Sequence, residues 1–288
     1  MALQSSGAIS LNQIHIEAGG STGTQASVND EDIRGLIGLS SGATNAFSAY
    51  YGAASSAPTA SLIQDDFYES GDGFPSTDNT NRWLDLGSYS GTKLVVGCML
   101  LAGGSSTTAN TYMSLGNPNT TGTLFTLAAR RREQHPNSSD NGGSLSNLMW
   151  DVAIYYMVTS LQGQNKVFGN GGSGRSMLHF YEVSGYNSST PYTTDTAINT
   201  NNDGTMGITV NSQYNGVTIG AAMSFQSDSP YEHTVTNDDF TTTFSKQSAS
   251  EHTSFYDNGT SSGNITYTYT NTGYSGGQPM TMVTASWK

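Results

Sequence analysis

The sequence predicts a mainly β protein, in which a small helical N-terminal module precedes an antiparallel β-sandwich of jelly-roll-like type. Gly, Ser, Thr and Asn make up nearly half of the 288 residues, and these residue types are unfavourable inside helices. Only 11% of the residues are charged, whereas 16 Tyr, 10 Phe and 3 Trp supply apolar area, which argues against charge-driven disorder. The hydrophobic period also changes along the chain, from a helical period to a period of two, near residue 58.

The first 54 residues contain three short amphipathic patterns. Ser10 and Gln13 have the spacing of a capping box, and Asn29 begins a second helix whose first turn is acidic, as the helix dipole favours. A unit of this size buries little surface by itself. We therefore expect its apolar stripes to attach it to another protein, the alternative being a self-contained small domain. The expected interaction residues are Ile9, Leu11, Ile14, Ile33, Leu36, Ile37, Phe47, Tyr50 and Tyr51.

Small residues and a proline at 53–60 mark a change in composition that is typical of a linker. The predicted organisation is a helical module at 1–54, a linker at 55–61 and a β-sandwich domain at 62–288. Residues 152–158 are apolar on both faces and predict a central strand. Asn215-Gly216 predicts a two-residue hairpin turn that pairs residues 206–214 with 217–225 in one ladder. Further strands are expected at 92–101, 123–129, 148–159, 176–183, 264–270 and 280–287.

The net charge of −12 and the pI near 4.5 make nucleic acid a poor partner, because an acidic protein repels phosphate backbones. No apolar run approaches the roughly 20 residues of a membrane helix, so no membrane insertion is expected. The start of the chain lacks the pattern of a secretory signal, which favours synthesis and assembly in a cytoplasm. A single cysteine, Cys98, excludes an intramolecular disulfide and a cysteine-based zinc site.

Several motifs match enzyme signatures without the structural context that the chemistry needs. The GxGxxG match at 169–174 precedes a strand-like pattern rather than the helix that holds a pyrophosphate. The GxSxG matches at 38–42 and 259–263 lack a strand before and a helix after them. The sequence therefore predicts no enzyme, no catalytic residue and no cofactor.

Three clusters of charged or metal-ligating residues leave alternatives open. Arg130-Arg131-Arg132 predicts a loop that contacts carboxylates of a neighbour or of the same chain. Two Glu-His pairs could form a metal site, or they could be solvated polar residues at strand ends. Separately, a pair of carboxylates for polysaccharide cleavage stays open. The residues concerned are Glu232, His233, Glu251 and His252, with Asp238 or Asp239, for the metal, and Asp65, Asp66 and Glu69 for cleavage.

The N-terminal stretch resembles a recurring module of virion structural proteins in tailed bacteriophages, especially phages of marine cyanobacteria. The resemblance covers roughly residues 7–54. It is carried by ISLNQIHIEAGG at 9–20, NDEDIRGLIG at 29–38, SGA at 41–43 and FSAYYG at 47–52. More loosely, the remainder resembles β-sandwich domains of phage structural proteins at LVVG (94–97), AIYY (153–156), HFYEVSG (179–185) and ASW (285–287).

The resemblance implies a tail-fibre or neck-appendage component of a virion, assembled in the host cytoplasm. Its N-terminal module would attach to other neck, tail or capsid proteins, the chain would form a homo-oligomer, and the exposed sandwich would contact host surface glycans. Ala49 departs from the resembled module, which carries an acid near that place, so attachment is expected through the aromatic rings. The alternatives are a capsid-decorating or purely architectural virion protein without receptor binding, and a polysaccharide depolymerase.

Overall fold

The computed structural model describes residues 3–4, 6–37, 44–51, 58–68, 83–88, 91–102, 113–115, 122–134, 149–169, 175–186, 188–199, 204–212, 216–224, 233–237, 243–248, 252–260, 263–271 and 280–288. The chain divides into two compact units, Met1–Ala57 and Pro58–Lys288. The first strand begins at Thr59, so the last part of the range predicted as a linker is strand. No helix among the described residues has the length and apolar character to cross a membrane.

The N-terminal unit contains two short helices, α1 (Leu11–Glu17) and α2 (Glu31–Gly35), and the 3₁₀ turn η1 (Phe47–Tyr50). The capping box of α1 is confirmed, because Gln13 N donates to Ser10 Oγ at 3.2 Å and Ser10 N donates to Gln13 Oε1 at 2.8 Å. After α1, Gly19 has φ of 102°, a left-handed conformation that glycine adopts without strain and that ends a helix.

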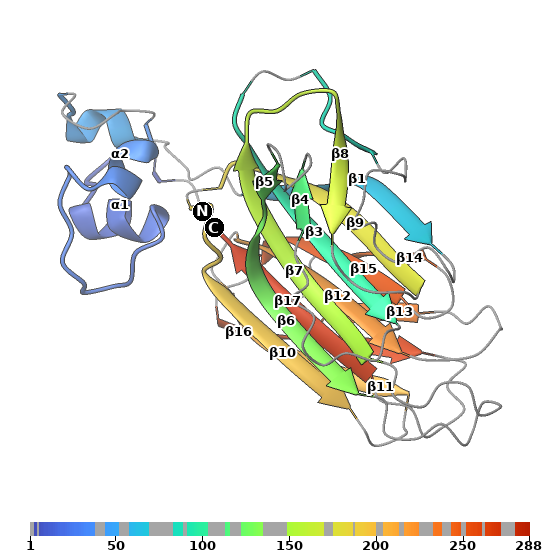
Figure 1. Ribbon diagram of the computed structural model, residues 1–288. Helices are drawn as coiled ribbons and strands as arrows, with labels where there is room; N and C mark the ends of the chain where they lie inside the picture. Colours follow the sequence, from blue (N-terminus) through green and yellow to red (C-terminus); the bar gives the residue numbers. More distant parts are fainter. Residues whose placement is uncertain are drawn as a thin grey trace, which may run out of the picture. The chain divides into compact units, whose positions relative to one another are not determined.

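The second unit is mainly β, and every strand pairing in it is antiparallel. Its described strands form four sheets, which we number I to IV (Figure 1). Sheet I has the order β2 (Trp83–Asp85), β8 (Gln164–Gly169), β4 (Met113–Leu115), β5 (Thr123–Leu124), and sheet II the order β1 (Thr59–Tyr68), β9 (Arg175–Ser184), β3 (Lys93–Ala102), β7 (Met149–Thr159), β6 (Thr126–Gln134). Sheet III has the order β10 (Thr193–Asn199), β17 (Met280–Trp287), β12 (Gly216–Ser224), β15 (His252–Thr260), β14 (Thr243–Ser248), and sheet IV the order β11 (Thr205–Ser212), β16 (Gly263–Asn271), β13 (His233–Asn237).

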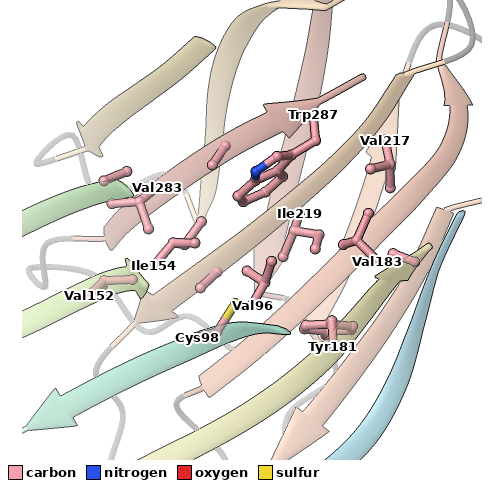
Figure 2. Close-up of a cluster of buried hydrophobic side chains, with 14 of the residues drawn as sticks. Val96, Cys98, Val152, Ile154, Tyr181, Val183, Val217, Ile219, Val283 and Trp287 are labelled. Carbon is pink, nitrogen blue, oxygen red and sulfur yellow. The ribbon is translucent and has the colours of Figure 1, made fainter. Parts of the chain in front are cut away.

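Three apolar cores lie between successive sheets and show that the sheets stack in the order I, II, III, IV. The I–II core includes Leu84 of sheet I and Val95 of sheet II. The II–III core joins Val96 to Ile219 and Trp287 (Figure 2), and the III–IV core joins Phe255 to Tyr267, whose ring centroids are 5.1 Å apart. Sheets I and II come entirely from β1–β9, and sheets III and IV from β10–β17.

The layering explains the burial pattern of each strand. The inner strands β12 and β17 are buried along their whole length, whereas β11 in the outer sheet IV alternates between exposed and buried residues. The prediction of a central strand at 152–158 is confirmed, since β7 lies between β3 and β6 and contributes alternate residues to the two cores that flank sheet II. From Asp151 to Thr159, where the exposure of the side chains is described, Val158 is the one exposed residue.

The predicted hairpin of β11 and β12 is wrong. β11 pairs with β16 in sheet IV, and β12 pairs with β15 and β17 in sheet III. The apolar face of β11, with Ile208, packs into the III–IV core, whereas Ile219 of β12 packs into the II–III core. One buried face and one exposed face, as expected from alternation, are found in β11, whereas β12 is buried on both faces. The alternation does not specify which strand lies alongside.

Candidate functional site

Seven of the nine residues predicted to attach the N-terminal unit to a partner lie in or against the core of that unit. Ile14, Ile33 and Tyr50 are fully buried, and the other four pack against this cluster while partly buried. A unit with few apolar residues needs most of them to hold its own helices together. The four partly buried residues are Ile9, Leu11, Leu36 and Ile37.

Among the described residues of the N-terminal unit, three large apolar side chains are exposed, and two of them are aromatic. Phe47 is 43% exposed and Tyr51 is 37% exposed, although Tyr50 between them is buried. Ile16 on α1 is 44% exposed and was not among the predicted interaction residues, because it lies outside the stripe formed by Leu11 and Ile14. We call Ile16, Phe47 and Tyr51 the exposed apolar set of the N-terminal unit.

Hydrogen bonds hold this aromatic segment in place. The Tyr51 hydroxyl donates to the carbonyl oxygen of Gly7. Asn45 Nδ2 donates to the Tyr50 hydroxyl at 3.1 Å and to the carbonyl oxygen of Val28 at 2.8 Å. The segment is thus tied to chain positions 17 to 44 residues earlier, which fixes the backbone that carries the exposed rings.

A polar cluster joins sheets II and III inside the β unit. His179 Nδ1 and the Tyr181 hydroxyl both hydrogen-bond to Ser254 Oγ, and all three residues are fully buried. Asp65 on β1 and Cys98 on β3 lie directly opposite His179 in the strand register. Ser, His and Asp are the residue types of a hydrolytic triad, yet the buried Ser254 hydroxyl offers a substrate no access here. The cluster instead satisfies polar groups across the interface of two sheets.

This cluster predicts loss of stability in alkali. Burial, reinforced by the neighbouring Cys98, raises the pKa of Tyr181 well above its ordinary value of 10.0. A raised pKa means that the fold favours the neutral phenol, so the stabilisation is complete below about pH 10 and is lost as the pH rises further. Ultraviolet difference absorbance should show that at least one tyrosine ionises only when the far-ultraviolet circular dichroism reports unfolding, and that this signal is reduced in the Tyr181→Phe variant.

The Tyr181→Phe variant is the control, since it lacks the titrating hydroxyl and should lose stability less steeply above pH 10. Ionisation of every tyrosine at ordinary pH with the fold intact would contradict the prediction. Burial also raises the pKa of the Cys98 thiol, so this thiol should resist alkylation until the chain unfolds.

The basic run contacts a carboxylate of the same chain, as predicted, although Arg130 to Arg132 lie on strand β6 rather than in a loop. Arg130 Nε donates to Asp151 Oδ1 at 2.8 Å, and Arg132 Nη2 donates to Asp151 Oδ2 at 2.7 Å. Asp151 is 3% exposed, so two guanidinium groups share one buried carboxylate. The run is therefore part of the fold.

The residues of the open metal alternative lie in different sheets where the structure describes them. His233 is on β13 of sheet IV and His252 is on β15 of sheet III. Glu232, Glu251 and the aspartates at 238–239 lie outside the described residues. Within the described ranges, no three His, Cys, Asp or Glu side chains are grouped so that they could hold a metal ion.

The carboxylates considered for polysaccharide cleavage are placed only in part. Asp65 and Asp66 lie on β1, opposite His179 and Leu178, and Glu69 lies outside the described residues. The segment 170–174 of the GxGxxG match also lies outside them, and the strand β9 begins at Arg175, as expected. The GxSxG match at 259–263 connects the strands β15 and β16, not a strand and a helix; of the match at 38–42, no residue is among the described ones.

The described architecture defines the class of this protein as a two-unit, mainly β protein with stacked antiparallel sheets. No protein-family model, curated protein or solved structure matches the chain. A functional proposal therefore depends on the residues of the chain itself.

Proposed function

We propose that the chain is a non-enzymatic structural component of a tailed-phage virion, carried in a tail or neck fibre or appendage. The N-terminal unit acts as a helical anchoring module that attaches to other virion proteins after synthesis in the host cytoplasm. The β unit, a jelly-roll-like sandwich, is exposed on the particle and contacts host surface glycans. The chain works as a homo-oligomer, because virion positions are occupied by symmetry-related copies.

The exposure of Phe47 and Tyr51 is the observation that carries this proposal. Large aromatic rings are enriched where proteins bind other proteins, and this unit exposes two of them within five residues while it buries Tyr50 between them. Their segment is the FSAYYG motif of the resemblance to virion proteins. Held by hydrogen bonds from Tyr51 and Asn45, the rings are preorganised for docking and lose little freedom on binding.

The β unit supports a projecting role through its construction. Sheets II and III each have five antiparallel strands and face each other across one core, the layer arrangement from which the jelly-roll assignment is proposed. Ladders of this kind form a stiff body that keeps a surface at a fixed distance from its anchor.

The test is incorporation into particles in a host that supplies the variant as its only copy. The double variant Phe47→Ser, Tyr51→Ser should enter particles at least about thirtyfold less than the native chain, because two aromatic anchors that each contribute about 1–3 kcal/mol together contribute at least about 2 kcal/mol. Tyr192→Ser is the matched control, since Tyr192 is also an exposed aromatic residue but belongs to the β unit. It should incorporate normally.

Hydrogen exchange on α1 should show that the double variant keeps its N-terminal fold. A second arm removes residues 1–57, which should leave a folded β unit that particles no longer contain. Normal incorporation of the double variant and of the truncated chain would overturn the proposal.

A further inference from the structure

The outward face of sheet I carries an exposed tryptophan among polar side chains. On β2, Trp83 and Asp85 are exposed, while Leu84 between them is fully buried in the I–II core. On the neighbouring strand β8, Lys166 lies opposite Trp83 and Gln164 lies opposite Asp85. Because residues directly opposite in a ladder share a face, these four side chains form one surface, which we call the Trp83 face.

The indole ring and a cation are paired on this face. Lys166 Nζ lies 5.3 Å from the centroid of the Trp83 ring, within the range of a cation–π contact. Trp83 is 37% exposed, although tryptophan is highly buried on average. The chain holds only 10 lysines and arginines, and one of them lies over this exposed ring.

The backbone under the Trp83 face is fixed from the adjoining sheet. The Gln64 side chain on β1 donates to the carbonyl oxygen of Trp83 and accepts from Asp85 N. Asp85 Oδ1 also accepts from Gly87 N at 2.8 Å. The short strand β2 is thereby held on the side away from β8, so the ring is presented on an ordered platform.

We propose that the Trp83 face binds a saccharide that contains a hexuronic acid. The apolar C–H face of a pyranose ring packs against the part of the indole that Lys166 leaves exposed. The carboxylate of the sugar pairs with the adjacent Lys166 ammonium, and the amide of Gln164 and the carboxylate of Asp85 hydrogen-bond to hydroxyl groups. The inference deepens the proposed function, because it assumes that the β unit is the part that meets host glycans.

The overall charge of −12 does not prevent this contact. The Debye length is about 8 Å at physiological ionic strength, so the charges that act on a sugar carboxylate here are those of the Trp83 face itself: the Lys166 ammonium opposite Trp83 and the Asp85 carboxylate two residues further along β2. One such shallow site binds weakly, and several copies on a particle would raise the effective affinity through avidity.

The experiment is calorimetry on the full chain with an oligogalacturonate and with a neutral maltooligosaccharide of the same length. The acidic oligosaccharide should bind saturably and the neutral one more weakly. Trp83→Ala should weaken binding of the acidic ligand about tenfold, whereas Trp83→Tyr should keep most of it. Lys166→Gln should remove the preference for the acidic ligand, and the Tyr192→Ala control should bind like the native chain.

Absence of saturable binding, unchanged binding by Trp83→Ala or equal binding of the two ligands by the native chain would overturn the inference. Particle incorporation separates the two proposals. Suppose that Trp83→Ala incorporates like the native chain and that the Phe47→Ser, Tyr51→Ser variant fails to incorporate. The anchoring proposal then holds, and a failure to bind saccharide contradicts only the proposal for the Trp83 face. If the Phe47, Tyr51 variant incorporates normally while the acidic saccharide still binds at Trp83, the failure concerns only the anchoring proposal.

Discussion

Replacing Trp287 by alanine should lower the free energy of unfolding of the β unit by about 4 kcal/mol, the usual range for a large-to-small change at a fully buried aromatic residue. Trp287 has no exposed surface and lies in the II–III core. Its ring meets Tyr156 edge-on with centroids 6.3 Å apart, and its Nε1 donates to the carbonyl oxygen of Ser189 at 3.0 Å. The variant therefore loses packing, a ring contact and a hydrogen bond together.

Trp83→Ala is the matched control, because it makes the same chemical change at an exposed position. It should cost clearly less than Trp287→Ala, because more than a third of the Trp83 side chain already lies in solvent. Urea unfolding followed by circular dichroism gives both values, and equal losses from the two variants would contradict the layered arrangement of sheets II and III.

Replacing Asp151 by alanine should cost about 3–5 kcal/mol, because it leaves two guanidinium groups without the buried carboxylate that balances them. The reason is the geometry of the site: Arg130 and Arg132 both donate to a carboxylate that is almost entirely buried. The loss should be seen in the same urea experiment as a lower transition midpoint.

Asp195→Ala serves as its control, since Asp195 is exposed on β10 and its carboxylate accepts a local hydrogen bond from Thr196 N, the next residue in the chain. A change within about 0.5 kcal/mol is expected there. If Asp151→Ala were as stable as Asp195→Ala, the two arginines would have to be neutralised by other groups.

Local features of the fold could be predicted from the sequence. The capping box needs only Ser10 and Gln13, three residues apart, so its signal lies within one helical turn. The sequence of β7 is apolar on both faces, which predicts a central strand. β17 begins and ends at the residues expected from the alternation. In each case the physical cause acts between near neighbours along the chain.

Features that depend on distant partners could not be predicted. The alternation on either side of Asn215-Gly216 predicts that β11 and β12 are strands. It does not predict their pairing partners, because β16 and β15 lie tens of residues later in the chain. Equally, nothing near Ser254 in the sequence indicates that His179 comes within hydrogen-bonding distance from another sheet.

In the candidate site, too, local features were predictable and features that depend on distant contacts were not. Helical spacing grouped Phe47, Tyr50 and Tyr51 on one face, but η1 is a four-residue 3₁₀ turn, to which the helical period of 3.6 does not apply. Only the ring of Tyr50 fits the small core, and its neighbours are left in solvent. Trp83 gave no sequence signal, because a three-residue strand is too short for its alternation to be recognised.

The division of the strands between the first and second halves of the β unit has a consequence for biosynthesis. Every strand of sheets I and II precedes residue 185, so the ribosome has delivered a complete two-layer sandwich before β10 emerges. The apolar face of sheet II stays uncovered until sheet III has been synthesised, and domains of nascent chains generally fold from the N-terminus onward. When the later half packs on, Ser254 hydrogen-bonds to His179 and Tyr181 of the earlier half. These bonds align the two halves against each other.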